Sequence, residues 1–279
     1  MEHKPSRFFP RTDELSVLTA VIGLGYAVSR LLQLPSRTLE AMLFGSPISV
    51  RVDGNLVLLL LLAALITTGT DMLMRSHPRL RQDPLDLRPL CHWILPSLTA
   101  LNVGMLLNGP MQVQVWFLGM LAGTAVLVLV LVAEYAVIDS AHPAFYQMQI
   151  VLTLLAYLVA LVWFSWVAQQ GARGALSATS TFLIGGLISF RLLRLHGDPV
   201  SQAGWNSLVV GLLLAELMWV LGYWALPPLV VGAWLLVVLH LAVGLILKGR
   251  DRGVSGRAMV EHALVALIAV VLTALLLTR

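Results

Sequence analysis

The chain has 279 residues, of which 58% are hydrophobic and only 11% are charged, and its mean hydropathy is +0.87. This composition excludes a soluble globular protein and indicates an integral membrane protein, with no polar block long enough for a separate soluble domain. The net charge of +4 comes from basic residues in short loops between apolar runs. We therefore expect these basic residues to orient the chain in the lipid bilayer, which is the expected partner, and not to bind nucleic acid.

Nine apolar runs are long enough to cross a hydrocarbon core of about 30 Å as an α-helix. They predict an all-α, polytopic transmembrane bundle in successive antiparallel hairpins, forming one membrane domain over residues 1–279. The third run is the weakest because it is short and contains Pro96, so a re-entrant hairpin formed with its neighbour is the alternative there. The predicted spans are 15–34, 55–74, 91–107, 113–138, 148–168, 176–196, 205–226, 229–247 and 259–278.

The positions of the basic residues predict the direction in which the chain threads through the membrane. With the N-terminus in the cytoplasm, thirteen of the eighteen lysines and arginines fall on the cytoplasmic side, where positive charge is enriched. We predict a multi-pass protein of the cell membrane with a cytoplasmic N-terminus and an external C-terminus. The first run is long and lacks a clear cleavage site, so a retained anchor is expected and not a signal peptide.

Residues 35–54 form the longest connection that this topology places outside the membrane. The segment SRTLEAMLFG begins with Ser36 as a candidate cap and has the apolar spacing of a short interfacial helix. The following ISVRVDG alternates apolar and polar residues, as a strand of a hairpin does. A small ordered outer element is predicted, with a plain connector as the alternative.

Glu216 and His240 are the ionisable residues that lie deepest in the predicted spans. They lie on consecutive spans joined by the turn LPPL, eleven residues before Pro227 and twelve after Pro228. At 1.5 Å per residue, both should be roughly 16–18 Å from that turn. The sequence predicts an intramembrane polar pair at the centre of the bilayer, serving either a transported proton or solute or only the register of two helices.

A second set of ionisable residues lies one to two turns from the cytoplasmic ends of three predicted spans. Acids and bases at similar depth would compensate one another's charge, and Asp139 with His142 would suit proton transfer. The alternative is a set of solvated helix ends. The predicted cytoplasmic-side charge cluster comprises Asp71, Glu134, Asp139, His142, Arg191 and Arg194.

Motifs of membrane enzymes and cofactor sites do not occur in the sequence. VEHAL at 260–264 lacks the second histidine of a zinc motif, and the single Cys91 provides no set of thiols for a metal. No second deep histidine accompanies His240 as a haem ligand, so no catalytic residue, metal or cofactor is predicted. The G-x-x-x-G of Gly119 and Gly123 predicts close helix packing within the chain.

Three classes of function fit these observations. A permease or ion-coupled transporter using Glu216 and His240 is favoured, because a carboxylate and a histidine at membrane depth have the chemistry of a proton relay. A non-catalytic subunit or assembly factor, bound to other membrane subunits, is the first alternative. A cytoplasmic-face enzyme acting on a lipid or lipid-linked substrate is the least favoured, and it would use Asp139, His142, Arg191 and Arg194.

Overall fold

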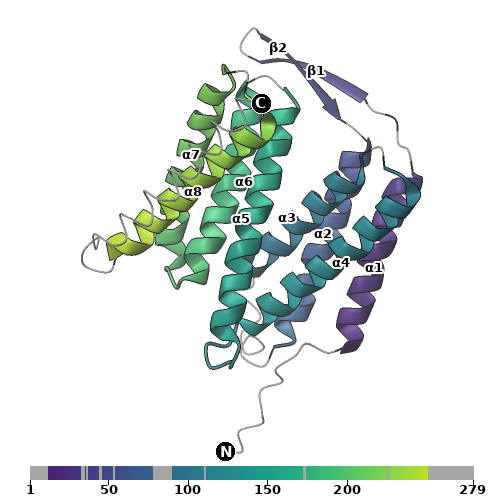
Figure 1. The fold of residues 1–279 in the computed structure, drawn as a ribbon, viewed down its shortest axis with the longest axis vertical. Helices are drawn as coiled ribbons and strands as arrows, with labels where there is room; N and C mark the ends of the chain where they lie inside the picture. Colours follow the sequence, from purple (N-terminus) through teal and green to yellow (C-terminus); the bar gives the residue numbers. More distant parts are fainter. Residues whose placement is uncertain are drawn as a thin grey trace, which may run out of the picture. The chain divides into compact units, whose positions relative to one another are not determined.

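A computed structural model describes most of the chain. Eight α-helices and two β-strands occur in the described part (Figure 1). Contacts divide the chain into two compact units, Met1–Gln149 and Ile150–Arg279, with the boundary inside the fifth helix. The single membrane domain expected from the sequence stays a prediction. The described residues are 12–32, 35, 37–43, 46–52, 54–77, 90–109, 111–171, 174–224 and 226–250.

The helices follow the predicted apolar runs closely, although several ends differ by a few residues. Seven of them are long and apolar enough to cross a membrane, and α3 is shorter. The predicted span 259–278 lies outside the described residues, so the count of about nine spans and the direction of threading stay predictions. The helices are α1 Thr12–Leu31, α2 Gly54–Arg75, α3 Leu90–Leu107, α4 Val113–Ala136, α5 Phe145–Gln169, α6 Gly174–Leu195, α7 Val200–Leu221 and α8 Pro228–Arg250.

Helix α3 runs without a reversal through Pro96 and is shorter than the seven long helices, so both the membrane span and the re-entrant hairpin with its neighbour stay predictions for this segment. Proline is tolerated in membrane helices because packed neighbours and Ser or Thr side chains compensate for the missing backbone bond. Just beyond Pro96, the Thr99 hydroxyl donates to the Leu95 carbonyl at 2.7 Å. The helix has 18 residues, which corresponds to about 27 Å.

Residues 37–52 contain an antiparallel pair of strands, β1 Arg37–Leu43 and β2 Ser46–Val52, with Arg37 opposite Val52. The strand predicted from ISVRVDG is confirmed, whereas the interfacial helix predicted from SRTLEAMLFG is wrong. An isolated helix shorter than about 12 residues is marginal, and pairing with β2 supplies backbone partners for β1 instead. The proposed cap Ser36 lies outside the described residues.

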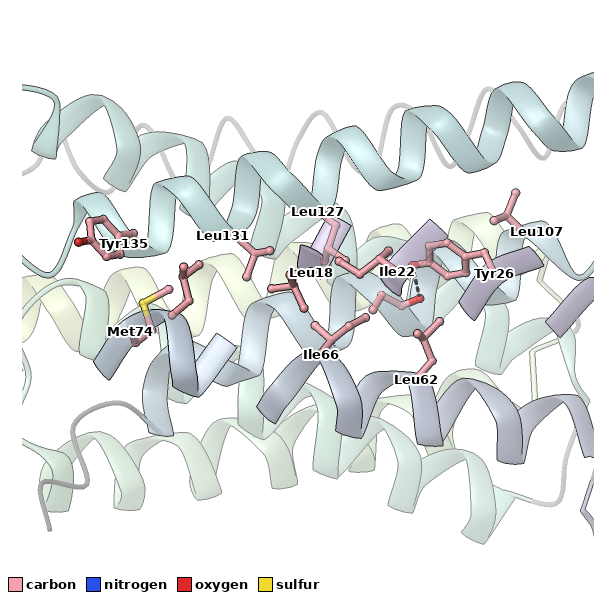
Figure 2. Close-up of a cluster of buried hydrophobic side chains, with 12 residues drawn as sticks. Leu18, Ile22, Tyr26, Leu62, Ile66, Met74, Leu107, Leu127, Leu131 and Tyr135 are labelled. Atoms are coloured by element: carbon pink, nitrogen blue, oxygen red, sulfur yellow. Dashed lines mark hydrogen bonds between the residues drawn. The ribbon is translucent and has the colours of Figure 1, made fainter. Parts of the chain in front are cut away.

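The first unit packs α1 to α4 side by side around one apolar core (Figure 1). Figure 2 shows Ile22 and Tyr26 of α1 facing Leu62 and Ile66 of α2 in this core. The buried Tyr26 hydroxyl donates to the Ala100 carbonyl at 3.0 Å, which satisfies a polar group inside the core and ties α1 to α3. These contacts fix the helices that carry the candidate site described below.

The second unit contains most of α5 together with α6, α7 and α8. A Cβ atom on Gly232 of α8 would lie 3.0 Å from the backbone nitrogen of Ser165 and would collide with its hydroxyl, so α5 and α8 approach closely there. The Trp163 indole of α5 donates to the Ser180 hydroxyl of α6 at 3.2 Å. Small residues at such contacts let membrane helices approach backbone to backbone.

Candidate functional site

A buried histidine–carboxylate pair lies at one end of the first unit. His92 is in the first turn of α3 and Glu134 is in the last turn of α4, and the His92 Nδ1 atom lies 2.7 Å from Glu134 Oε2. The Glu134 side chain has no exposed surface, whereas the His92 side chain is 15% exposed. The distance is typical of a charge-assisted hydrogen bond.

The packing of α3 against α4 explains why these two residues meet. A Cβ atom on Gly119 would touch Leu107, and one on Gly123 would collide with Val103. The two contacts advance in opposite directions along the two helices, so the helices are antiparallel, and the same register places His92 opposite Glu134. The predicted close packing at the G-x-x-x-G is confirmed, and the glycines bring the two helices close enough for the pair to form.

A second histidine packs against the residue that follows Glu134. His77, just after α2, packs edge-on against Tyr135 of α4 with ring centroids 4.8 Å apart. Both residues are only 3% exposed. Because Tyr135 directly follows Glu134, the last turn of α4 contacts both His77 and His92.

The other acids predicted for the cytoplasmic-side cluster have local partners. Both carboxylate oxygens of Asp71 accept from Arg75 Nε, at 2.8 and 2.9 Å, one turn further along α2. Asp139 Oδ1 accepts from the Ala141 backbone N–H at 2.8 Å, inside the turn that follows α4. Glu134, in contrast, is bonded to a side chain of a different helix, His92 of α3.

His142 lies in the same turn as Asp139. Its Nδ1 atom accepts from the Ala144 backbone N–H at 3.1 Å, and its own backbone N–H donates to the Asp139 carbonyl at 2.9 Å. An accepting Nδ1 places the ring proton on Nε2. The predicted acid–histidine function of this pair stays a prediction, while both side chains help to shape the turn.

The predicted basic members of the cluster lie in the second unit. Arg191 of α6 is 3% exposed, and Arg194 Nη1 donates to the Asp198 carbonyl at 2.5 Å, in the turn before α7. Arg194 therefore binds the last turn and loop of α6, as a basic residue at a helix C-terminus can. The predicted compensation of Asp71 and Glu134 by Arg191 stays a prediction.

The structure does not bring Glu216 and His240 together as a pair. Glu216 is exposed on α7 and has no hydrogen bond or ion pair with any other described residue. Helix α7 ends at Leu221 and is followed by a turn, so Glu216 lies only about 7.5 Å from the helix end, whereas His240 lies about 18 Å from Pro228 at the start of α8. These two distances start from different points of the connection, so the equal depth predicted for Glu216 and His240 stays a prediction.

His240 instead contacts α5. Its Nδ1 atom lies 3.1 Å from the Tyr157 hydroxyl, and the two rings are packed edge-on with centroids 5.4 Å apart. The expectation that His240 points toward another helix is met, but the partner residue is Tyr157. The Ser165–Gly232 contact two turns away holds the two helices close enough for this bond.

Replacing Tyr157 by phenylalanine should remove the bond to His240 while keeping the aromatic contact. Hydrogen bonds between membrane helices contribute about 0.6 kcal/mol on average, with a maximum near 1.7 kcal/mol, so we expect a loss of that order. Unfolding by a denaturing detergent, followed by circular dichroism, measures it. Tyr146→Phe is the matched control, because Tyr146 is 77% exposed on the same helix, and an equal loss in both variants would contradict the assignment.

The ligand set of a metal site does not occur among the described residues. No group of three His, Cys, Asp or Glu side chains within the described ranges is arranged to hold a metal ion. Cys91 is buried and free, as expected of a small core residue. A histidine ring nitrogen hydrogen-bonded to a carboxylate oxygen, as in the His92–Glu134 pair, can bind and transfer a proton.

Sequence reasoning did not pair His92 with Glu134, because counting residues outward from the turn between α3 and α4 gives the wrong register. Leu107, at the end of α3, faces Gly119, so the first six residues of α4 extend beyond α3. The feature of the sequence that could have predicted the pairing is the G-x-x-x-G, because close approach at Gly119 and Gly123 fixes the register of α3 against α4. No comparable motif in the sequence predicts that Tyr157 is the partner of His240.

The seven long apolar helices make this chain an integral membrane protein of the helical, multi-pass class. The chain belongs to a family described as proteins of unknown function, DUF5656, whose profile matches residues 34–276. No curated protein and no solved structure matches the chain significantly.

Proposed function

We propose that this protein is a multi-pass permease of the cell membrane that couples the movement of a solute to protons, and that His92 and Glu134 carry the proton. The observation that supports this proposal is a fully buried carboxylate bonded at 2.7 Å to a histidine that is partly exposed. The proposal assigns the proton-carrying role to His92 and Glu134, which contact each other, instead of to Glu216 and His240, which do not.

The position of each partner suits a relay. Histidine is the side chain that most readily changes its charge near neutral pH, and His92 is accessible enough to exchange a proton with water. A proton on Nδ1 can pass to Glu134 Oε2, which converts an ion pair into a neutral pair without moving a heavy atom far. Ionisable residues inside a membrane bundle are costly, and they usually mark ion or solute pathways.

Stability alone gives little reason for such a pair. A buried ion pair is often no more stabilising than well-packed apolar residues of similar volume, because both charges lose their hydration. Two apolar residues would therefore hold α3 against α4 at least as well. This argument favours a role in proton binding over a purely structural role for His92 and Glu134.

A second candidate function is that of a non-catalytic subunit bound to other membrane subunits. The observation that favours it is the exposed Glu216, which has exposed apolar neighbours on α7, including Leu212, Leu213 and Trp219. A carboxylate that faces lipid is unfavourable, and a partner helix with a hydrogen-bond donor would relieve this cost. The enzyme alternative gains no specific observation, because Asp139 and His142 bond to their own turn.

The test of the permease is solute-driven proton entry into liposomes. The full chain is reconstituted with a pH-sensitive dye inside, the membrane potential is clamped with potassium and valinomycin, and amino acids, sugars and organic acids are added in turn. We expect at least one of these classes to accelerate proton entry over protein-free liposomes. Glu134→Gln should return the rate to the protein-free level, since an amide cannot take up the proton.

Asp71→Asn is the matched control for this measurement, because Asp71 lies in the same unit and pairs only locally with Arg75 in the contacts described above. It should keep the solute-driven rate of the unaltered protein. Full solute-driven proton entry in Glu134→Gln would reject the role of the pair. If no solute class accelerated proton entry, the permease itself would be rejected.

A further inference from the structure

The second unit contains a cavity that the proposed function does not use. It has a volume of about 360 Å³ and lies where the end of α5 and the first turn of α6 meet the end of α7 and the start of α8. Ligand pockets typically have volumes of about 300–1,000 Å³. The cavity therefore has room for a small ligand or for part of a longer one.

The floor and the rim of this cavity differ in character. Met218, Leu221 and Val231 lie on the floor and are only 4–5% exposed. Tyr223 and Trp224 lie on the rim and are 77% and 60% exposed. The cavity thus has a buried apolar floor beneath an exposed aromatic rim.

The rim also defines where the cavity lies relative to a bilayer. Tryptophan and tyrosine gather at the level of lipid headgroups, and here they follow the last turn of a membrane helix. Trp219, at the same mouth, donates its indole N–H to the Tyr223 hydroxyl at 3.1 Å, so the polar edges of the two rings meet at the surface. A ligand entering between these rings would leave the headgroup region and reach an apolar floor.

None of the described residues that line the cavity has a charged side chain. Its polar groups are the indole, phenol and serine hydroxyl groups and the backbone at the glycines. These residues suit a molecule with ester or hydroxyl oxygens at one end and a hydrocarbon chain at the other. Bilayer lipids have this chemistry and are present at high concentration at this level of the membrane.

We propose that this cavity binds one acyl chain of a bilayer lipid, with the lipid headgroup held at the aromatic rim. The chain enters past Trp219 and contacts Met218, Leu221 and Val231. The volume accommodates part of a single chain and not a whole lipid. This proposal is independent of proton transport, because it uses no residue of the His92–Glu134 pair.

Photocrosslinking tests the proposal directly. The full chain is reconstituted in liposomes that contain a phosphatidylcholine with a diazirine in one acyl chain, irradiated, and digested, and the adducts are mapped by mass spectrometry. Lipids that only surround the protein cannot reach side chains that are 4–5% exposed. We therefore expect adducts on Met218, Leu221 and Val231, in addition to those on exposed residues such as Leu212.

Gly174→Leu should block the mouth without disturbing the fold. A Cβ atom at Gly174 would meet the Trp219 ring at 3.7 Å, an ordinary contact, and the rest of the leucine would occupy the entrance. Adducts on the floor should fall by roughly tenfold, the factor that corresponds to about 1.4 kcal/mol, while those on Leu212 stay constant. Gly204→Leu is the control, because a Cβ atom there meets open space, and it should leave the floor adducts unchanged.

Trp219→Ala provides a second variant that enlarges the mouth and should keep or increase the floor adducts. The proposal is overturned if the floor is unlabelled in the unaltered protein while Leu212 is labelled. It is also overturned if Gly174→Leu leaves the floor adducts unchanged. Stronger labelling of the floor by a water-soluble diazirine-bearing aromatic compound would overturn the lipid assignment in favour of a soluble ligand.

Discussion

Replacing Glu134 by alanine is expected to lower the free energy of unfolding by about 3–5 kcal/mol, the cost of breaking a buried ion pair by removing one partner. The loss arises because His92 keeps its polar ring in the same packed environment without the carboxylate that it binds at 2.7 Å. Glu134 has no exposed surface, so water cannot replace it without opening the helix end. Reversible unfolding in detergent micelles, followed by tryptophan fluorescence, measures the change.

Removing both partners should cost less than removing one. In Glu134→Leu with His92→Leu, both members of the pair are removed together and apolar packing replaces them. The double variant should therefore recover much of the stability lost in Glu134→Ala, while it has no solute-driven proton entry. Equal losses in the single and double variants would show that shape, and not pairing, determines the stability at this position.

The second large effect is expected at Gly211, where the backbones of α6 and α7 are in close contact. A Cβ atom there would lie 2.8 Å from the Phe182 carbonyl oxygen and 3.3 Å from the Gly186 Cα atom. Both atoms belong to backbone, so neither can rotate away, and the helices must separate. Gly211→Ala should lower the free energy of unfolding by about 1–3 kcal/mol, the usual cost of overpacking.

Gly204→Ala on the same helix separates this steric effect from helix propensity. A Cβ atom at Gly204 meets nothing within 4 Å, and alanine favours a helix over glycine by up to about 1 kcal/mol. Gly204→Ala should therefore leave stability unchanged or raise it slightly, as judged by the same unfolding measurement. A similar change in both variants would mean that the α6–α7 contact is not limited by the glycine.

The ends of the helices show which helix bounds can be predicted from local sequence and which cannot. Helix α2 spans Gly54–Arg75, close to the apolar run at 55–74, because run length and charged ends are local properties. The end of α7 is not predicted by the apolar run, because the run continues past Leu221 into a turn that begins at Gly222. Hydropathy alone does not distinguish an apolar turn at a membrane surface from one more turn of helix.

The candidate site depended on information that no single segment contains. The sequence indicated that Glu134 is an unusual residue for an apolar helix, but its partner His92 is 42 positions away. Whether two residues on different helices meet depends on the offset and rotation of those helices, which their packing determines. Between α3 and α4, the contact of Val103 with Gly123 determines the offset and the rotation of the two helices.

Composition and the pattern of apolar runs by themselves determined the helical membrane class of this protein and the approximate bounds of the described helices, because the cost of exposing polar backbone to lipid acts on every segment separately. Tertiary structure alone decided that Glu134 binds His92, that His240 binds Tyr157 and that Glu216 lies exposed. These outcomes depend on close contacts at a few small residues, where a shift of one residue in register would turn each polar group toward a different neighbour.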